Sequence, residues 1–236
     1  MKNVIILTYG ISGSSVLSAF ISKAGYWLGK ETFKNEDYDT FENIDMIRLN
    51  ERIVREAGCP IDSLRQFSKG ELKRIENCRI SEEFKAFAKQ LEKHSPWLLK
   101  DPRLYATIRF WKKVINLEEV KFILLAREPL QMWISNLLRR RFQSFSYNKN
   151  FDAKVEDSYA EFLEENSLGY IRINFEDFML HPEKNISELN DFLGINLSLE
   201  DFKRVYKGII YKRRHGIFDF LKAVAIYAKN YPPKYA

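Results

Sequence analysis

The sequence predicts an α/β protein in which helices cover both faces of a parallel β-sheet. Four short runs rich in apolar and β-branched residues have the length and composition of buried strands; they are residues 4–7, 97–99, 120–126 and 170–173. Between these runs lie stretches whose apolar residues recur at helical spacing. Because strands that alternate with helices form parallel sheets through right-handed crossovers, we expect a three-layer arrangement of helices, sheet and helices.

The first strand continues directly into a loop of small residues and then into a helix. The loop contains Gly10, Ser12, Gly13, Ser14 and Ser15. A strand, a glycine and serine loop and a helix N-terminus together direct backbone N–H groups and the positive end of the helix dipole at one point, which favours a phosphate. No Lys-Ser or Lys-Thr pair closes the loop, so it is not a Walker A motif.

Helical spacing also predicts helices over residues 84–91, 104–115 and 130–142. Residues 34–95 are mostly polar and helical, and they form a long insertion between the first two strands. This insertion is either a cap that faces the substrate or an additional helical layer. We expect a single domain over residues 1–236, in which residues 212–236 form a basic segment, an amphipathic stretch and a tail.

The charge balance indicates an anionic partner. A formal net charge of +6 and a pI near 9.1 fit a nucleotide, a nucleic acid, a membrane surface or simply a solvated basic surface. The sequence has no segment that combines aromatic and basic residues as RNA-binding motifs do, so we do not expect a nucleic-acid partner.

Cysteine usage and hydropathy argue against a zinc-binding, a disulfide-stabilised or a membrane-spanning protein. Cys59 and Cys78 are the only cysteines, and their spacing fits neither a zinc site nor a disulfide framework, so we expect no structural metal. No apolar run is long enough to span a membrane, and we therefore expect a cytoplasmic protein. The sequence leaves the oligomeric state open.

Charged residues follow several of the predicted strands, where ligands bind to open parallel sheets. These positions include residues 100–103, 127–129 and 174–177. Arg127 ends the most apolar strand, and Ser135 follows eight residues later, about two turns into the next helix. Arg127 and Ser135 can therefore face one phosphate from two sides, the guanidinium with a rigid fork of donors and the hydroxyl with another donor.

These motifs, in this order, resemble the sulfotransferase family, which transfers a sulfuryl group from 3′-phosphoadenylyl sulfate (PAPS). Residues 41–54 (FENIDMIRLNERIV) and 97–104 (WLLKDPRL) look like segments of bacterial members. Residues 175–178 (FEDF) with 192–194 (FLG) are similar to the Tyr-Glu-Asp-Leu and Phe-Leu-Gly segments of the family. The resemblance implies a P-loop-NTPase-like sulfotransferase fold, release of adenosine 3′,5′-bisphosphate and chemistry without a metal.

The resemblance also implies which residues hold the nucleotide. In the family, the first loop holds the 5′-phosphosulfate, which here involves Gly10, Ser12, Gly13, Ser14 and Ser15. The Arg-x-Pro…Ser unit, here Arg127 and Ser135, holds the 3′-phosphate. The basic cluster at residues 212–216 resembles a C-terminal loop that closes over the nucleotide, which adds Arg213 and Arg214.

One position departs from the family pattern. Where the family usually has Arg or Lys in the first loop, this chain has Ile11. A cation there stabilises the negative charge that develops on the oxygen leaving PAPS. Lys100 and Arg103, expected to emerge beside the loop from the neighbouring strand, are candidates to replace it. The alternative is a protein that binds the nucleotide without catalysis.

An acceptor hydroxyl also needs a base within hydrogen-bond reach. Glu31 follows the first helix, where related enzymes often place a catalytic glutamate, and Glu42 matches a position of bacterial members. Asp101 is expected to pair with Arg103 or Arg127 and to order the site.

The function expected from the resemblance is therefore sulfuryl transfer from PAPS to the hydroxyl of a glycan, a lipid or a small metabolite. Two alternatives stay open. A nucleoside or nucleotide kinase shares the strand, loop and helix but would need the missing loop lysine. A catalytically silent nucleotide-binding protein would account for Ile11.

Overall fold

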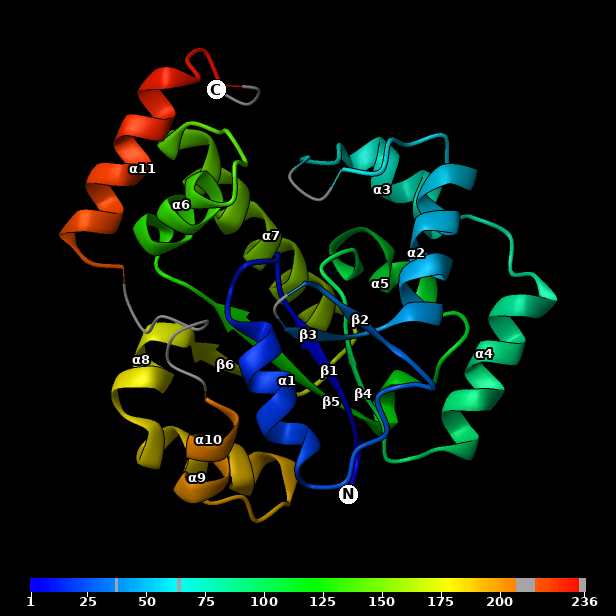
Figure 1. Cartoon of the computed structure of the whole chain (residues 1–236). Helices are drawn as coiled ribbons and strands as arrows, with labels where there is room; N and C mark the ends of the chain where they lie inside the picture. The colour runs from blue at the N-terminus through cyan, green and yellow to red at the C-terminus, as the bar shows by residue number, and fades with distance from the viewer. Residues whose placement is uncertain (37, 63–64, 207–214, 234–236) are drawn as a thin grey trace.

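A four-stranded parallel sheet lies at the centre of the protein, as the sequence predicts (Figure 1). The computed structural model describes residues 1–36, 38–62, 65–206 and 215–233. The strands are β1 (Asn3–Leu7), β4 (Leu98–Lys100), β5 (Val120–Ala126) and β6 (Tyr170–Asn174), and their order in the sheet is β4-β1-β5-β6. Val4 pairs with Leu98 on one side and with Lys121 on the other, so β1 is a central strand.

Alternating residues of the strands build two cores, one on each face of the sheet. Val4 and Ile6 of β1 pack with α1 (Ser14–Ser22), α8 (Phe175–Leu180), α9 (Pro182–Leu193) and α10 (Leu199–Val205). Ile5 and Leu7 pack with α2 (Ile44–Glu56), α3 (Lys69–Glu76), α4 (Glu82–Lys93), α5 (Leu104–Trp111) and α7 (Phe145–Glu165). Because successive side chains of a strand point to opposite faces, a run of buried residues produces three layers.

A third, smaller core, separate from the two on the faces of the sheet, joins two helices. Trp133, Ile134 and Leu137 of α6 (Pro129–Leu138) pack against Ala223 of α11 (Ile217–Lys229). In Figure 1, α11 lies against α6 at the edge of the molecule, well away from α2 and α4. A short 3₁₀ helix (Leu117–Glu119) leads into β5.

A hairpin that the composition does not reveal lies at the start of the insertion. Besides α2, α3 and α4, a two-stranded antiparallel sheet forms from β2 (Thr32–Lys34) and β3 (Asp39–Asn43). Side chains stabilise this hairpin: the Thr32 hydroxyl donates to Oδ2 of Asp39 (2.6 Å), and the Thr40 hydroxyl donates to the Phe33 carbonyl (2.7 Å). Strands of three and five residues are too short to give a clear alternating pattern.

Two predicted helices end earlier than expected. The helix predicted to reach residue 115 ends at Trp111, after which the N–H groups of Lys113 and Val114 bond three residues back rather than four. The helix predicted to reach residue 142 ends at Leu138, and Arg140 follows with a φ of 59°. A left-handed residue cannot continue a right-handed helix, so apolar spacing alone overestimates its length.

The order of the strands fixes where a ligand can bind. From β1 the chain forms β4 on one side of it and then crosses to form β5 on the other side. Such a change of direction leaves a crevice at the carboxyl end of the first strand, where the connecting loops diverge. The loop after β1 and the residues that follow β4 and β5 all lie at this edge.

Candidate active site

The loop after β1 turns sharply before α1 begins. Gly10, Ile11 and Gly13 all have left-handed backbone conformations, with φ of 76°, 53° and 84°. The buried hydroxyls of Thr8 and Ser12 form a hydrogen bond that closes the loop. No side chain caps α1, and its first turn has no acidic residue. The positive end of the α1 dipole at this edge of the sheet is therefore not neutralised locally, which suits an anion.

Arg127, directly after β5, connects this loop to α8. Its Nε donates to Oε1 of Glu176 (3.0 Å), and its Nη1 donates to the carbonyl oxygen of Ile11 (2.7 Å). The ring of Phe175 lies 5.2 Å from the guanidinium carbon. Within the described part of the chain, the Nη2 amino group makes no hydrogen bond. Burial lowers the pKa of Arg127 and the Glu176 carboxylate opposes this change.

Ser135, on α6, contacts the residues that precede α11. Its Oγ lies 2.7 Å from Nε2 of His215, whose Nδ1 lies 3.1 Å from Oδ2 of Asp219. The backbone N–H of His215 donates to Oε1 of Gln131, also on α6 (2.6 Å). Arg127 and Ser135 thus flank the first half of α6, and each contacts a different segment of the chain.

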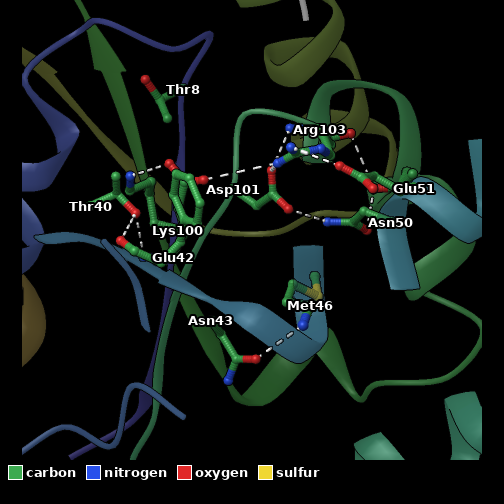
Figure 2. A network of polar contacts seen from close by, with 12 residues as sticks. Thr8, Thr40, Glu42, Asn43, Met46, Asn50, Glu51, Lys100, Asp101 and Arg103 are labelled. Carbon is green, nitrogen blue, oxygen red and sulfur yellow. Dashed lines mark hydrogen bonds and ion pairs between the residues drawn. The ribbon is translucent and has the colours of Figure 1, made fainter. Parts of the chain in front are cut away.

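Lys100 and Glu42 form the central ion pair of the site (Figure 2). Lys100 ends β4 with its side chain only 2% exposed, and its Nζ donates to Oε1 of Glu42 on β3 at 2.7 Å. Asn43, the next residue, accepts a hydrogen bond from the Met46 N–H (3.0 Å) and so starts α2. Burial raises the pKa of Glu42, and the Lys100 ammonium opposes this rise.

Asp101 and Arg103 extend the network towards α2. Oδ1 of the fully buried Asp101 accepts from Nη1 of Arg103 (2.9 Å), and its Oδ2 accepts from Nδ2 of Asn50 (2.9 Å). Nη2 of Arg103 donates to Oε1 of Glu51 (3.0 Å), and its Nη1 lies 3.9 Å from Oε2 of Glu42. Of the two partners expected for Asp101, the structure therefore selects Arg103, whereas Arg127 pairs with Glu176.

The other expected site residues lie apart from this network or outside the described residues. Glu31 is exposed in the loop before β2, where its carbonyl oxygen accepts from the Ile44 N–H (3.2 Å). Ser14 is buried and Ser15 half-buried in the first turn of α1. Arg213 and Arg214 lie outside the described residues.

Three residues that the sequence reasoning did not assign contribute to the site. Glu176 fixes Arg127, and its Oε2 also accepts from the Glu128 N–H (2.9 Å). Asn50 and Glu51 of α2 fix Asp101 and Arg103. The position of Glu176 just after the last strand is a usable signal, whereas nothing in the sequence pairs α2 with β4.

A cavity of about 180 Å³ opens beside Arg103. One wall comes from the insertion and includes Val54, Ile61 and Phe67, and the other comes from the start of α5 and includes Tyr105. The rings of Phe67 and Tyr105 lie 6.0 Å apart at 55°. Among the residues that the structure describes, no three His, Cys, Asp or Glu side chains gather into a group that could hold a metal ion.

The fold and this site define a three-layer α/β protein with a phosphate-type loop at the carboxyl edge of its parallel sheet. Residues 12–200 match the model of the Sulfotransferase family, and the chain belongs to that family. The match confirms the resemblance drawn from the sequence motifs. No curated protein matches the chain.

Solved structures agree on the fold. The sulfotransferase domain from the Synechococcus PCC 7002 olefin synthase has a TM-score of 0.55 at 15% identity over 98% of each chain. The sulfotransferase domain from the curacin biosynthetic pathway has 0.53 at 15% identity, over 92% of this chain and 81% of that domain. Sulfotransferase STF1 from Mycobacterium tuberculosis H37Rv has a TM-score of 0.50 at 7% identity, over 97% of this chain and 77% of STF1. These likenesses establish the P-loop-like α/β fold.

Proposed function

We propose that this sulfotransferase moves a sulfuryl group from PAPS to an acceptor hydroxyl and releases adenosine 3′,5′-bisphosphate. The observation that supports this most is the loop after β1, where an uncapped helix N-terminus and Arg127 meet. A nucleotide with anionic groups at both its 5′ and its 3′ position needs such donors at two separate points. The N–H groups of residues 12–15 would hold its 5′-phosphosulfate.

The 3′-phosphate would bind between Arg127 and Ser135. Arg127 has its Nη2 amino group left for such a ligand, because Nε and Nη1 are taken by Glu176 and Ile11. Ser135 would bind together with His215, which already contacts its hydroxyl. Arg213 and Arg214, the two residues before His215 in the sequence, would add charge there.

Glu42 is our candidate for the base. A buried carboxylate with a raised pKa is a better proton acceptor than an exposed glutamate such as Glu31. As the acceptor oxygen forms its bond to sulfur, its proton passes to Glu42. The bond between sulfur and the bridging oxygen of the 5′-phosphate breaks, and that oxygen leaves with the electron pair.

Lys100 would supply the cation that Ile11 does not. While Glu42 is ionised, the ammonium of Lys100 is engaged with it at 2.7 Å. Protonation of Glu42 removes that attraction at the moment when negative charge develops on the leaving oxygen, so the ammonium can turn to the new charge. A donor of this kind lowers the activation free energy by about 3–4 kcal/mol. Asp101 and Arg103 would hold the side chains of Lys100 and Glu42 in position.

The cavity beside Arg103 is our candidate for the acceptor site. An engineered protein cavity of about 150 Å³ holds benzene, so about 180 Å³ accommodates one ring of an acceptor. Phe67 and Tyr105 offer the apolar walls that such a ring needs. Of the acceptor classes considered, a small hydroxylated metabolite fits this volume best, and a larger glycan or lipid would extend out of it.

Calorimetry with adenosine 3′,5′-bisphosphate tests the donor assignment. We expect micromolar binding that weakens at least tenfold with adenosine 5′-phosphate, which lacks the 3′-phosphate, and weakens similarly in Ser135→Ala. No binding at high micromolar concentration would refute the assignment. Turnover of ATP with Mg²⁺ would favour a kinase instead. Tight bisphosphate binding without sulfuryl transfer to any of a broad panel of alcohols and phenols would favour a silent nucleotide-binding protein.

A further inference from the structure

Helix α11 has an apolar face that no described part of the chain covers. Ile217 is 64% exposed, Phe218 84%, Leu221 55% and Val224 39%. The opposite face, by contrast, is buried: Ala223 is 0% exposed and packs in the core formed with α6. The attachment of α11 to α6 therefore does not explain its four exposed apolar residues.

These residues form one continuous stripe. At about 100° per residue, Val224, Ile217, Leu221 and Phe218 fall within an arc of about 120° on the side away from Ala223. Lys222 and Lys229 lie along one edge of this arc. The only acidic residue of α11, Asp219, lies towards α6, where it contacts His215. The outer face of α11 is thus apolar with a basic border and no acid.

We propose that this face of α11 docks into the surface of an anionic lipid bilayer. Interfacial helices combine Phe and Leu on one face with lysines at its border, and lipid surfaces complement both features at once. A second copy of this chain fits less well, because an antiparallel twofold contact would place the outer lysines of two α11 helices together with no acid between them. The net charge of +6 also favours an anionic surface over a second copy of the chain.

The length of the helix fits a peripheral contact. The 13 residues of α11 span about 20 Å, less than the hydrocarbon core of about 30 Å. In residues 1–36, 38–62, 65–206 and 215–233, no helix has the length and apolar character that crossing a membrane requires. Docking would hold α11 in the plane of the surface, with Phe218 and Leu221 inserted and the lysine ammonium groups at the level of the headgroups.

Sedimentation with vesicles tests the proposal directly. We expect the full chain to bind vesicles of phosphatidylcholine with 30 mol% phosphatidylserine at least tenfold more tightly than pure phosphatidylcholine vesicles, and less tightly in 0.5 M salt. The double variant Phe218→Ser/Leu221→Ser should lose at least tenfold in binding, and Lys222→Gln/Lys229→Gln should lose the preference for phosphatidylserine. The matched control is Leu180→Ser, because Leu180 is 61% exposed on α8.

Other outcomes would overturn the proposal. If the wild-type chain stays in solution with the anionic vesicles, or if Phe218→Ser/Leu221→Ser sediments like the wild type, α11 does not dock on lipid. If light scattering shows a dimer that this double variant converts to a monomer, the face binds a second copy. The substituted side chains are exposed, so unchanged bisphosphate binding and thermal unfolding confirm that the variants are folded.

Discussion

At the scale of single residues, Arg127 has a structural role in addition to its proposed binding role. It is the partner of Glu176, a carboxylate whose side chain is only 4% exposed. Loss of one partner from a buried ion pair leaves an uncompensated charge, which costs about 3–5 kcal/mol. A single substitution of Arg127 therefore cannot separate binding from stability.

A pair of variants separates the two roles. Arg127→Met should lower the free energy of unfolding by about 3–5 kcal/mol, whereas Arg127→Met/Glu176→Gln should recover part of this loss because the introduced amide is neutral. Both should bind adenosine 3′,5′-bisphosphate at least tenfold more weakly than the wild type. Urea denaturation and calorimetry measure the two effects. Normal binding by the double variant would show that Arg127 has no part in holding the nucleotide.

Asp152 makes stability depend on pH. Burial raises its pKa to about 8 from 3.8, against a hydrogen bond from Asn148 that lowers it. Between these two values the unfolded chain releases the proton and the folded chain keeps it, so the contribution of Asp152 to stability falls as pH rises. The slope approaches about 1.4 kcal/mol per pH unit.

Asp152→Asn removes the titrating carboxyl group and with it this contribution to the pH dependence of stability. Urea denaturation at pH 5 and at pH 8 should show that the wild type loses more stability than the variant over this interval, by on the order of several kcal/mol. The amide oxygen of Asn can still accept from Asn148, which donates to Asp152 at 2.6 Å. Equal pH dependence in the two proteins would mean that Asp152 is ionised in the folded state.

If Glu42 is the base, its ionisation beside Lys100 determines how the rate of catalysis depends on pH. Glu42→Gln should lower kcat by about 10²–10⁴-fold, while the exposed Glu31 provides the matched control Glu31→Gln, with unchanged kcat. A base must be ionised, so kcat/KM of the wild type should rise with pH through the raised pKa of Glu42.

Lys100→Met tests the partner of that base. The variant removes the cation that opposes the rise, and its profile should therefore shift to higher pH. An unshifted profile would contradict Glu42 as the titrating base.

At the scale of elements, the start of α1 depends on the absence of a side chain at Gly13. A Cβ there would lie 2.1 Å from Cε2 of Phe175 on α8, whereas a Cβ at Gly10 would lie 3.7 Å from Cγ of Pro102, an ordinary contact. Both glycines have positive φ, so each alanine variant carries backbone strain of about 1–2 kcal/mol.

Comparison of these two glycines isolates the contact between α1 and α8. Gly13→Ala should be less stable than Gly10→Ala by about 1–3 kcal/mol, as measured by urea denaturation. Gly13→Ala/Phe175→Leu should reduce the difference, since the smaller side chain leaves room for the Cβ. Equal stabilities of the two single variants would show that the ring moves aside at little cost.

The elements also show which parts of the site the sequence could predict. Strands β1, β4 and β5 were predictable because they are buried on both faces and are therefore apolar along most of their length. The hairpin of β2 and β3 was not, because its strands are short and depend on contacts such as that between Thr32 and Asp39. Since β3 carries Glu42 to Lys100, the sequence could name both residues as candidates but could not indicate that they form a pair.

At the scale of the whole molecule, the order of the motifs along the chain was sufficient to predict the fold. Parallel strands share one carboxyl edge, so residues after β1, β4 and β5 had to converge there whatever their exact contacts. The pairing of those residues depends on side-chain geometry: the sequence left Arg103 and Arg127 as alternative partners of Asp101, and in the structure Arg103 pairs with Asp101 while Arg127 pairs with Glu176. The shared edge of the sheet was thus predictable, whereas the ion pairs at this edge required the structure.

Nucleotide binding should stabilise the whole domain, because the site joins the loop after β1 to α6 and α8. A ligand that binds only the folded state at 100 times its Kd adds about 2.7 kcal/mol, which raises the Tm of a chain of this size by about 5–10 °C. We expect this shift in scanning calorimetry with adenosine 3′,5′-bisphosphate, and an equal shift in the presence of EDTA. In Walker A proteins a Lys-Ser or Lys-Thr pair closes the loop, and its hydroxyl ligates Mg²⁺ while its lysine contacts the phosphates. Since the first loop here has no such pair, chelation should not change the result. A shift that EDTA abolishes, or one that ATP with Mg²⁺ produces and the bisphosphate does not, would contradict the proposed donor.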